Sequence, residues 1–359
     1  MREKLSAIEG CLIGAAVGDA LGLSCEGLSK ERQRKLFPEV DRYHFLLGKG
    51  MVSDDTEHAC MTAQALIASA GEPEAFLRSL AWRLRGWLLG LPAGVGFATL
   101  RAILKLWIGI PPTRSGVHSA GNGAAMRSAI LGVCYGDDPA RLRELVRAST
   151  RLTHTDPKAE LGALAVAVAA HVSSVHAERP ADVPAYLAAL LPLCEPFAPD
   201  TLPEFNRLLE QVASAVTRAI STEAFAAELG LRHGVSGYIY HTLPVALHAW
   251  LTHPRDFREV VLAVIRCGGD TDTTAAIVGG IVGAGVGKAE IPQAWRDGLC
   301  EWPRSLRWME RLAVRLDEVI AAQRPQRAVP LSLFALGLRN GWFLLLVLAH
   351  GLRRLFPPY

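Results

Sequence analysis

Apolar residues recur every three or four positions through most of the chain, which is the spacing that gathers them on one face of a helix. The alternation of apolar and polar residues that is typical of strands is nearly absent. The pattern therefore predicts an all-α protein with a large helical core. The clearest helical patterns run over residues 75–89, 98–107, 159–175, 205–220 and 306–320.

The two ends and the middle of the chain depart from this regular pattern. Glu9 and Asp19 interrupt the apolar stretch of residues 5–23, so we expect a first core helix there and not a signal peptide. Six prolines between residues 180 and 203 predict short helices and turns. Because features that could form one site lie on both sides of these prolines, we do not expect a domain boundary among them.

Two glycine series have a four-residue step, which places the glycines of each series on one ridge of a helix. The first is Gly10, Gly14, Gly18 and Gly22, and the second is Gly279, Gly283 and Gly287. Glycine costs a helix about 1 kcal/mol per residue, but it lets another backbone approach closely. We expect these ridges to serve close helix packing.

Composition and charge argue against some kinds of protein and site, including a nucleic-acid-binding protein and a structural zinc site. The formal net charge of +3 is small and the basic residues are dispersed, so we expect no direct nucleic-acid binding. The seven cysteines form no C-x-x-C pair, and their odd number is typical of a reducing compartment. We therefore expect a cytoplasmic protein without a disulfide framework or a structural zinc site.

Two acidic clusters stand directly before helical patterns, at 57–70 and at 275–286. They are Ser53-Asp54-Asp55-Thr56 and Asp270-Thr271-Asp272-Thr273-Thr274. Helix capping explains either cluster alone. Together the four aspartates exceed what capping needs, since a second carboxylate at a helix end adds repulsion unless a cation balances it. Hard oxygen ligands favour Mg²⁺ or Mn²⁺, and four negative charges would be neutralised by two divalent cations.

Six motifs, in this order along residues 8–284, resemble the ADP-ribosylglycohydrolase family. They are Gly18-Asp19-Ala20-Leu21-Gly22 with Glu26, Ser53-Asp54-Asp55-Thr56, Gly121-Asn122-Gly123-Ala124-Ala125-Met126-Arg127, Thr153-His154, Gly237-Tyr238 with Thr242-Leu243, and Gly268-Gly269-Asp270-Thr271-Asp272-Thr273. The resemblance implies a compact orthogonal multi-helix bundle. It also implies a binuclear Mg²⁺ or Mn²⁺ centre that holds the hydroxyls of the distal ribose, with the ligands Ser53, Asp54, Asp55, Asp270, Asp272 and Thr273.

The resemblance further makes Glu26 the catalytic acid/base, and a helix that continued past Gly22 would carry it along the glycine ridge. Asp19 is expected to support the site without binding a metal.

Glycines 121 and 123 would let backbone N–H groups approach a pyrophosphate at the start of a helix over 124–133. By resemblance, the diphosphate and distal ribose are lined by Ser119, Gly121, Asn122 and Gly123. Some family members that act on arginine carry an acid at the position of Ser119. His154 is placed near the ligand, and Tyr238 either stacks on adenine or packs in the core.

The chain is thus expected to hydrolyse the glycosidic bond between ADP-ribose and a modified protein side chain or a small acceptor. Two alternatives are a protein that binds ADP-ribose without turnover and a two-metal hydrolase of nucleotides. Retention of Glu26 and of all six ligand positions argues against the binding-only alternative.

The last residues need a separate interpretation. We expect a catalytic domain over 1–325 and an apolar tail over 326–359, whose residues 331–356 are interrupted by Arg339 and Asn340. The runs on either side are shorter than the roughly 18 residues that favour a spanning helix. The tail either lies in a membrane interface, which would make the protein membrane-associated, or packs on the catalytic domain or a partner.

Overall fold

The computed structural model describes residues 2–176 and 180–357, and within them isolated β-bridges are the only extended pairings, which confirms the all-α prediction. The α-helices are α1 (Arg2–Gly22), α2 (Lys30–Leu36), α3 (Asp54–Ser69), α4 (Pro73–Leu89), α5 (Phe97–Trp107), α6 (Ala129–Tyr135), α7 (Pro139–Arg151), α8 (Pro157–Val175), α9 (Val183–Cys194), α10 (Leu202–Thr217), α11 (Thr222–Glu228), α12 (Ile239–Thr252), α13 (Phe257–Ile265), α14 (Thr271–Val286), α15 (Gln293–Gly298), α16 (Leu306–Ala322) and α17 (Leu333–Arg353). Four 3-10 segments join them: η1 (Leu23–Cys25), η2 (Pro112–Arg114), η3 (Asn122–Arg127) and η4 (Lys288–Glu290).

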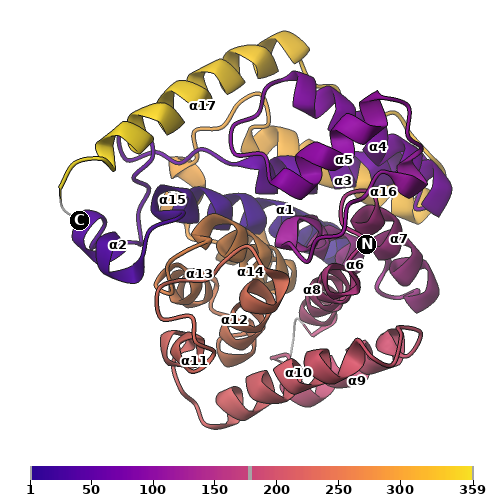
Figure 1. The fold of residues 1–359 in the computed structure, drawn as a ribbon. Coiled ribbons are helices and arrows are strands. Elements are labelled where there is room, and N and C mark those ends of the chain that lie inside the picture. Colours follow the sequence, from indigo (N-terminus) through magenta and orange to yellow (C-terminus); the bar gives the residue numbers. More distant parts are fainter. Residues whose placement is uncertain (1, 177–179, 358–359) are drawn as a thin grey trace.

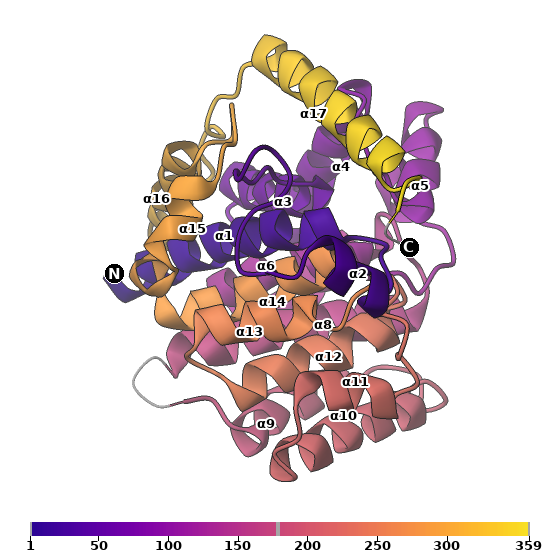
Figure 2. The same cartoon turned by 90° about the vertical axis from the view of Figure 1, so that its left-hand side faces the viewer.

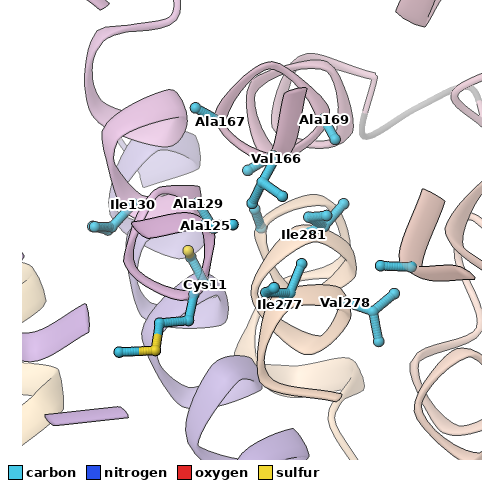
Figure 3. Packing of buried hydrophobic residues seen from close by; sticks show 14 of the residues in the cluster. Cys11, Ala125, Ala129, Ile130, Val166, Ala167, Ala169, Ile277, Val278 and Ile281 are labelled. Atoms are coloured by element: carbon cyan, nitrogen blue, oxygen red, sulfur yellow. The ribbon is translucent and has the colours of Figure 1, made fainter. Parts of the chain in front are cut away.

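Helices α1 and α14 lie side by side at the centre of the molecule, and α17 crosses the end opposite to α9 and α10 (Figures 1 and 2). The core around this central pair is shared by several helices. Figure 3 shows Cys11 of α1, Ala129 of α6, Val166 of α8 and Ile281 of α14 around one hydrophobic interior, and all four are buried.

The two glycine ridges meet where α1 and α14 pack against each other, as expected for close backbone approach. A β-carbon added at Gly14 would lie 2.3 Å from the carbonyl oxygen of Gly279, and one at Gly18 would lie 2.1 Å from that of Ala275. At the end of this ridge, a β-carbon at Gly22 would lie 2.6 Å from the α-carbon of Asp272. The glycines therefore bring the end of α1 against the acidic start of α14.

Two expected helices end or break earlier than the apolar pattern suggested. Helix α1 does not continue to Glu26, because the Thr271 hydroxyl donates to the Gly22 carbonyl at 2.8 Å, and the Glu26 amide bonds to Leu23 instead. The helix expected over 124–133 is divided at Ser128, whose hydroxyl donates to the Ala124 carbonyl. In both places a side chain takes the carbonyl that a continuous α-helix would use.

Among the residues that the structure describes, three helices are long and apolar enough to cross a membrane by length and composition, namely α1 with η1, α8 and α17. The apolar windows of α1 and α8 are 94% and 78% buried inside the protein, so these two are core helices. The window of α17 is 17% buried. The tail thus packs on the domain, one of the two alternatives expected for it, but through one face only; Pro358 and Tyr359 lie outside the described residues.

Candidate metal and active site

The structure brings the two acidic clusters together where α3 and α14 begin. Carboxylate oxygens of Asp19, Asp55 and Asp272 all lie within 4.8 Å of one another, and the three residues are buried. They come from α1, α3 and α14, and the glycine contact fixes α1 against α14. The expected meeting of the two clusters is therefore seen in the fold.

Asp19 uses its carboxylate to position the start of α3. Its two oxygens accept hydrogen bonds from the Ser53 amide at 3.0 and 2.9 Å, and one of them also accepts from the Thr56 amide at 3.1 Å. The Thr56 hydroxyl donates to the same oxygen at 2.5 Å. Through these bonds Asp19 holds the start of α3 in place. That it supports the site without binding a metal itself stays a prediction.

Asp55 and Asp272 keep oxygens without a hydrogen-bond partner. The Ser53 and Thr273 hydroxyls donate to Oδ2 of Asp55 at 3.0 and 3.2 Å, whereas Oδ1 of Asp55 and Oδ1 of Asp272 are buried and unpaired. An unpaired buried carboxylate oxygen is costly unless a cation or a donor meets it. The arrangement of donors and free oxygens therefore fits a divalent cation with hard oxygen ligands.

The electrostatics of the cluster point the same way. Burial, followed by the neighbouring carboxylates, raises the pKa of Asp54, Asp55 and Asp272 well above the usual value. Burial also raises the pKa of Asp19 to about 7, although the hydrogen bonds from Thr56 and Ser53 oppose this shift. Without a positive charge nearby, these acids would bind protons in place of remaining fully ionised.

Asp270 connects the acidic cluster to the glycine-containing turn. The Asn122 side chain donates to Oδ2 of Asp270 at 2.6 Å and to the Thr242 hydroxyl at 3.0 Å. The backbone N–H of Asn122 also donates to the Gly237 carbonyl at 2.9 Å. Asn122 therefore connects its own turn, which contains Gly121 and Gly123, to the start of α12 and the start of α14.

The other residues of the expected ligand pocket lie around this turn. The Ser119 hydroxyl accepts from the Gly121 amide at 3.3 Å, and Gly121 pairs with Tyr238 in a β-bridge. The His154 ring packs beneath the turn, since a β-carbon at Gly121 or Gly123 would lie 3.2 or 3.1 Å from it. Burial, and then Arg127, lowers the pKa of His154 to about 3, so this ring is neutral. The hydroxyl of Tyr238 accepts from Lys158 at 3.0 Å.

Glu26 lies on the turn that follows η1, and hydrogen bonds hold this turn against the acidic start of α14. The Gly27 amide donates to the Gly269 carbonyl at 2.8 Å, and the Gly269 amide donates to Leu28 at 2.9 Å. Glu26 is exposed, yet its protein surroundings and then Asp270 raise the pKa of its carboxyl, with Arg354 opposing. An accessible glutamate with a raised pKa suits proton transfer.

Below α3 lies a buried ion network that the sequence interpretation missed. Glu57 pairs with Arg304 and lies 3.5 Å from Arg339, while Arg339 donates to both oxygens of Glu301 at 2.9 Å. Arg339 also donates to the carbonyl of Val52, directly before Ser53. The sequence did contain a signal for this network, namely Arg339 in the middle of the apolar residues 331–356, because a buried arginine usually has an acidic partner.

Comparison with known proteins agrees with this geometry. The chain is 33% identical to an uncharacterised protein of Archaeoglobus fulgidus over 89% of this chain and 97% of the relative. It is 28% identical to the ADP-ribosyl-[dinitrogen reductase] glycohydrolase of Rhodospirillum rubrum over 80% of this chain and 87% of that enzyme. A solved ADP-ribosylglycohydrolase-related protein complex contains a chain that matches with a TM-score of 0.65 and 29% identity, over 89% of this chain and 100% of its own. The profile of the ADP-ribosylglycohydrolase family matches residues 1–326, so the chain belongs to this family of hydrolases that act on glycosyl bonds.

Proposed function

We propose that the chain hydrolyses the bond between the anomeric carbon of ADP-ribose and an acceptor atom, using divalent cations bound by its two acidic clusters. The observation that carries this proposal is the pair of buried, unpaired oxygens on Asp55 and Asp272, with Glu26 on an adjoining turn. Water adds to the anomeric carbon, the bond to the acceptor breaks, and the acceptor leaves with a proton.

The cations would be two Mg²⁺ or Mn²⁺ ions. When bound, they supply positive charge that orients the distal ribose hydroxyls and lowers the charge of the cluster. The donor set supports this identity, because carboxylate and hydroxyl oxygens suit hard divalent cations better than zinc. The proposed ligands are Ser53, Asp54, Asp55, Asp270, Asp272 and Thr273. The proximity of Asp55 and Asp272, whose carboxylate oxygens lie within 4.8 Å of each other, supports this set.

The residues of the chain divide the remaining work. Glu26 moves the proton between its carboxyl and the reacting oxygen or nitrogen, since it is exposed and its pKa is raised above that of an ordinary glutamate. The amides of the turn at Gly121 and Gly123 face the diphosphate, and Asn122 holds Asp270 in place. Tyr238, beside Gly121, offers a ring for adenine.

The acceptor is proposed to be a modified protein side chain or a small ADP-ribosyl compound. The Rhodospirillum rubrum relative is named for an ADP-ribosylated protein, dinitrogen reductase. Ser119 stands beside the Gly121 amide and is neutral, so it offers no carboxylate to a guanidinium acceptor. This favours acceptors other than arginine.

The experiment measures release of ADP-ribose from arginine- and serine-modified peptides with Mn²⁺, with Mg²⁺ and with EDTA. Glu26→Gln is expected to abolish release while Mn²⁺ still raises the melting temperature, and Asp272→Asn is expected to lose both responses. Glu144→Gln is the matched control, because this glutamate is exposed and lies on α7.

Four outcomes would contradict the proposal. Release of ADP-ribose in the presence of EDTA would show that the reaction does not need divalent cations. Release by Glu26→Gln would show that Glu26 does not carry the proton. ADP-ribose that binds without any turnover would favour a binding protein, whereas cleavage of nucleotide phosphates in place of ADP-ribosyl bonds would favour a two-metal nucleotide hydrolase.

A further inference from the structure

Helix α17 lies outside the family match and has two different faces. Its inner face is fixed to the domain by buried groups, since Arg339 pairs with Glu301 and Asn340 donates to the Gly90 carbonyl at 2.7 Å. Phe343 packs with Phe45, and His350 stacks on the same ring. These contacts orient the helix and leave its opposite face outward.

The outward face of α17 is a continuous apolar stripe. Its large side chains follow one another at three- or four-residue steps and are between 45% and 77% exposed. We call this set the α17 stripe: Phe334, Leu338, Trp342, Leu345, Leu348, Leu352 and Phe356. Seven large apolar residues in one line exceed the scattered exposure that is usual on a soluble surface, so the stripe has the character of a binding surface.

Further exposed leucines lie next to the points where α17 touches the domain. Leu89 and Leu91, which are 67% and 77% exposed, flank the Gly90 carbonyl that Asn340 contacts. Leu47 is 99% exposed, two residues after Phe45, against which His350 stacks. The apolar surface is thus wider than the helix itself.

The segments that contain α17 and the pair Leu89 and Leu91 carry basic residues but no acidic ones. The sequence contains no aspartate or glutamate from residue 319 to residue 359, and none from residue 75 to residue 136. Arg353 is exposed at the end of α17, while Lys49 is exposed near Leu47. An apolar stripe with only basic residues in its own segment complements a surface that is both apolar and anionic.

We propose that the α17 stripe binds the surface of an anionic lipid bilayer, with α17 lying in the plane of the interface. The helix has the length and composition of a spanning segment, but crossing the bilayer would withdraw Arg339 from its buried contacts with Glu301 and Val52. Lying flat keeps these contacts and buries the stripe among the acyl chains.

Membrane binding of this kind would set the position of the active site relative to the lipid. Arg354, two residues after Leu352 of the stripe, donates to the carbonyls of Glu26 and Ser24 at 2.8 and 3.1 Å. The proposed proton carrier therefore lies at the end of the membrane helix. This inference rests on the proposed function only for the identity of that carrier.

The test is flotation of the full chain with vesicles of phosphatidylcholine alone and of phosphatidylcholine with phosphatidylglycerol. We expect binding to the anionic vesicles, weakened by salt, and at least about tenfold less binding for Leu345→Glu with Leu352→Glu. Leu191→Glu is the matched control, since Leu191 is a 44% exposed leucine on α9, far from α17 in Figure 1, and it should leave binding unchanged.

Each other result would overturn the proposal. Equal binding to both vesicle types would show that anionic lipid is not required. Binding to neither type would show that the stripe does not bind a membrane. If the chain is a dimer that Leu345→Glu with Leu352→Glu converts to a monomer, and no vesicles bind, a second copy covers the stripe. Because binding is read by flotation, its failure is distinguishable from a loss of ADP-ribose release.

Discussion

Replacing Arg339 with methionine tests whether the C-terminal helix stabilises the site as well as covering it. Arg339 is 2% exposed and donates to both oxygens of Glu301 and to the Val52 carbonyl. Methionine keeps much of the volume but removes every one of these bonds. The carboxylate of Glu301 and the nearby Glu57 then remain buried, with Arg304 bonded to Glu57 alone.

Breaking a buried ion pair by removing one partner costs about 3–5 kcal/mol, which is a large part of the roughly 5–15 kcal/mol by which such domains are stable. We expect Arg339→Met to lose an amount in this range. The pKa of Glu301 is raised by burial and held down by Arg339, so it should rise further in the variant. A carboxyl whose pKa is raised in the fold costs stability as pH rises, and the loss should therefore be larger above neutral pH.

The assay is urea unfolding of wild type, Arg339→Met, Glu301→Gln and the double variant. The double variant should recover part of the loss, because it no longer buries an unpaired charge. Mn²⁺ affinity should also fall in Arg339→Met, since Val52 is the residue directly before the ligand cluster at Ser53. A loss below about 1 kcal/mol, or a double variant no more stable than Arg339→Met, would refute the reasoning.

Three further predictions concern the site and its support. Gly14→Ala should destabilise the protein by about 1–3 kcal/mol or more because its β-carbon would meet the Gly279 carbonyl at 2.3 Å, whereas Gly86→Ala near the C-terminal end of α4, where a β-carbon would meet nothing within 4 Å, should stabilise by up to about 1 kcal/mol; equal melting temperatures would contradict this. The rise in melting temperature on adding Mn²⁺ should be larger at about pH 8 than at about pH 5.5, because the proposed ligands Asp55 and Asp272, whose pKa is raised well above the usual value, bind protons in competition with the cation; a rise independent of pH would contradict it. Asn122→Ala should lower kcat/KM by about 10–100-fold through loss of its bond to Asp270, and an unchanged kcat/KM would show that the bond is dispensable.

Much of the fold could be predicted because the sequence signals were local. The helical periods over 75–89 and 159–175 correspond closely to α4 and α8, and the glycine step indicated the close contact of α1 with α14. The meeting of the two acidic clusters required the family resemblance, since the charge argument alone does not place Asp55 beside Asp272. Their roles as metal ligands stay a prediction.

What could not be predicted depended on individual side-chain hydrogen bonds and ion pairs. The end of α1 before Glu26 is set by the Thr271 hydroxyl, and the break at Ser128 is set by its own side chain, neither of which changes the apolar pattern. The interpretation of Arg339 as an interruption of the tail was incomplete for the same reason, because its partner Glu301 is in another segment.

The pairing of α1 with α14 determines when during synthesis the site can form. The bond from Thr271 to Gly22 joins residues separated by 249 positions, and the bond from Arg354 to Glu26 spans 328. Contacts between such distant residues close slowly, and on a ribosome the first helix leaves the exit tunnel long before its partner. Until α14 has been synthesised, α1 therefore lacks its packing partner, and its apolar residues and its glycine ridge stay exposed. The nascent chain can assemble the cation site only after α14 has emerged, so neither cation nor substrate can assist the early stages of folding.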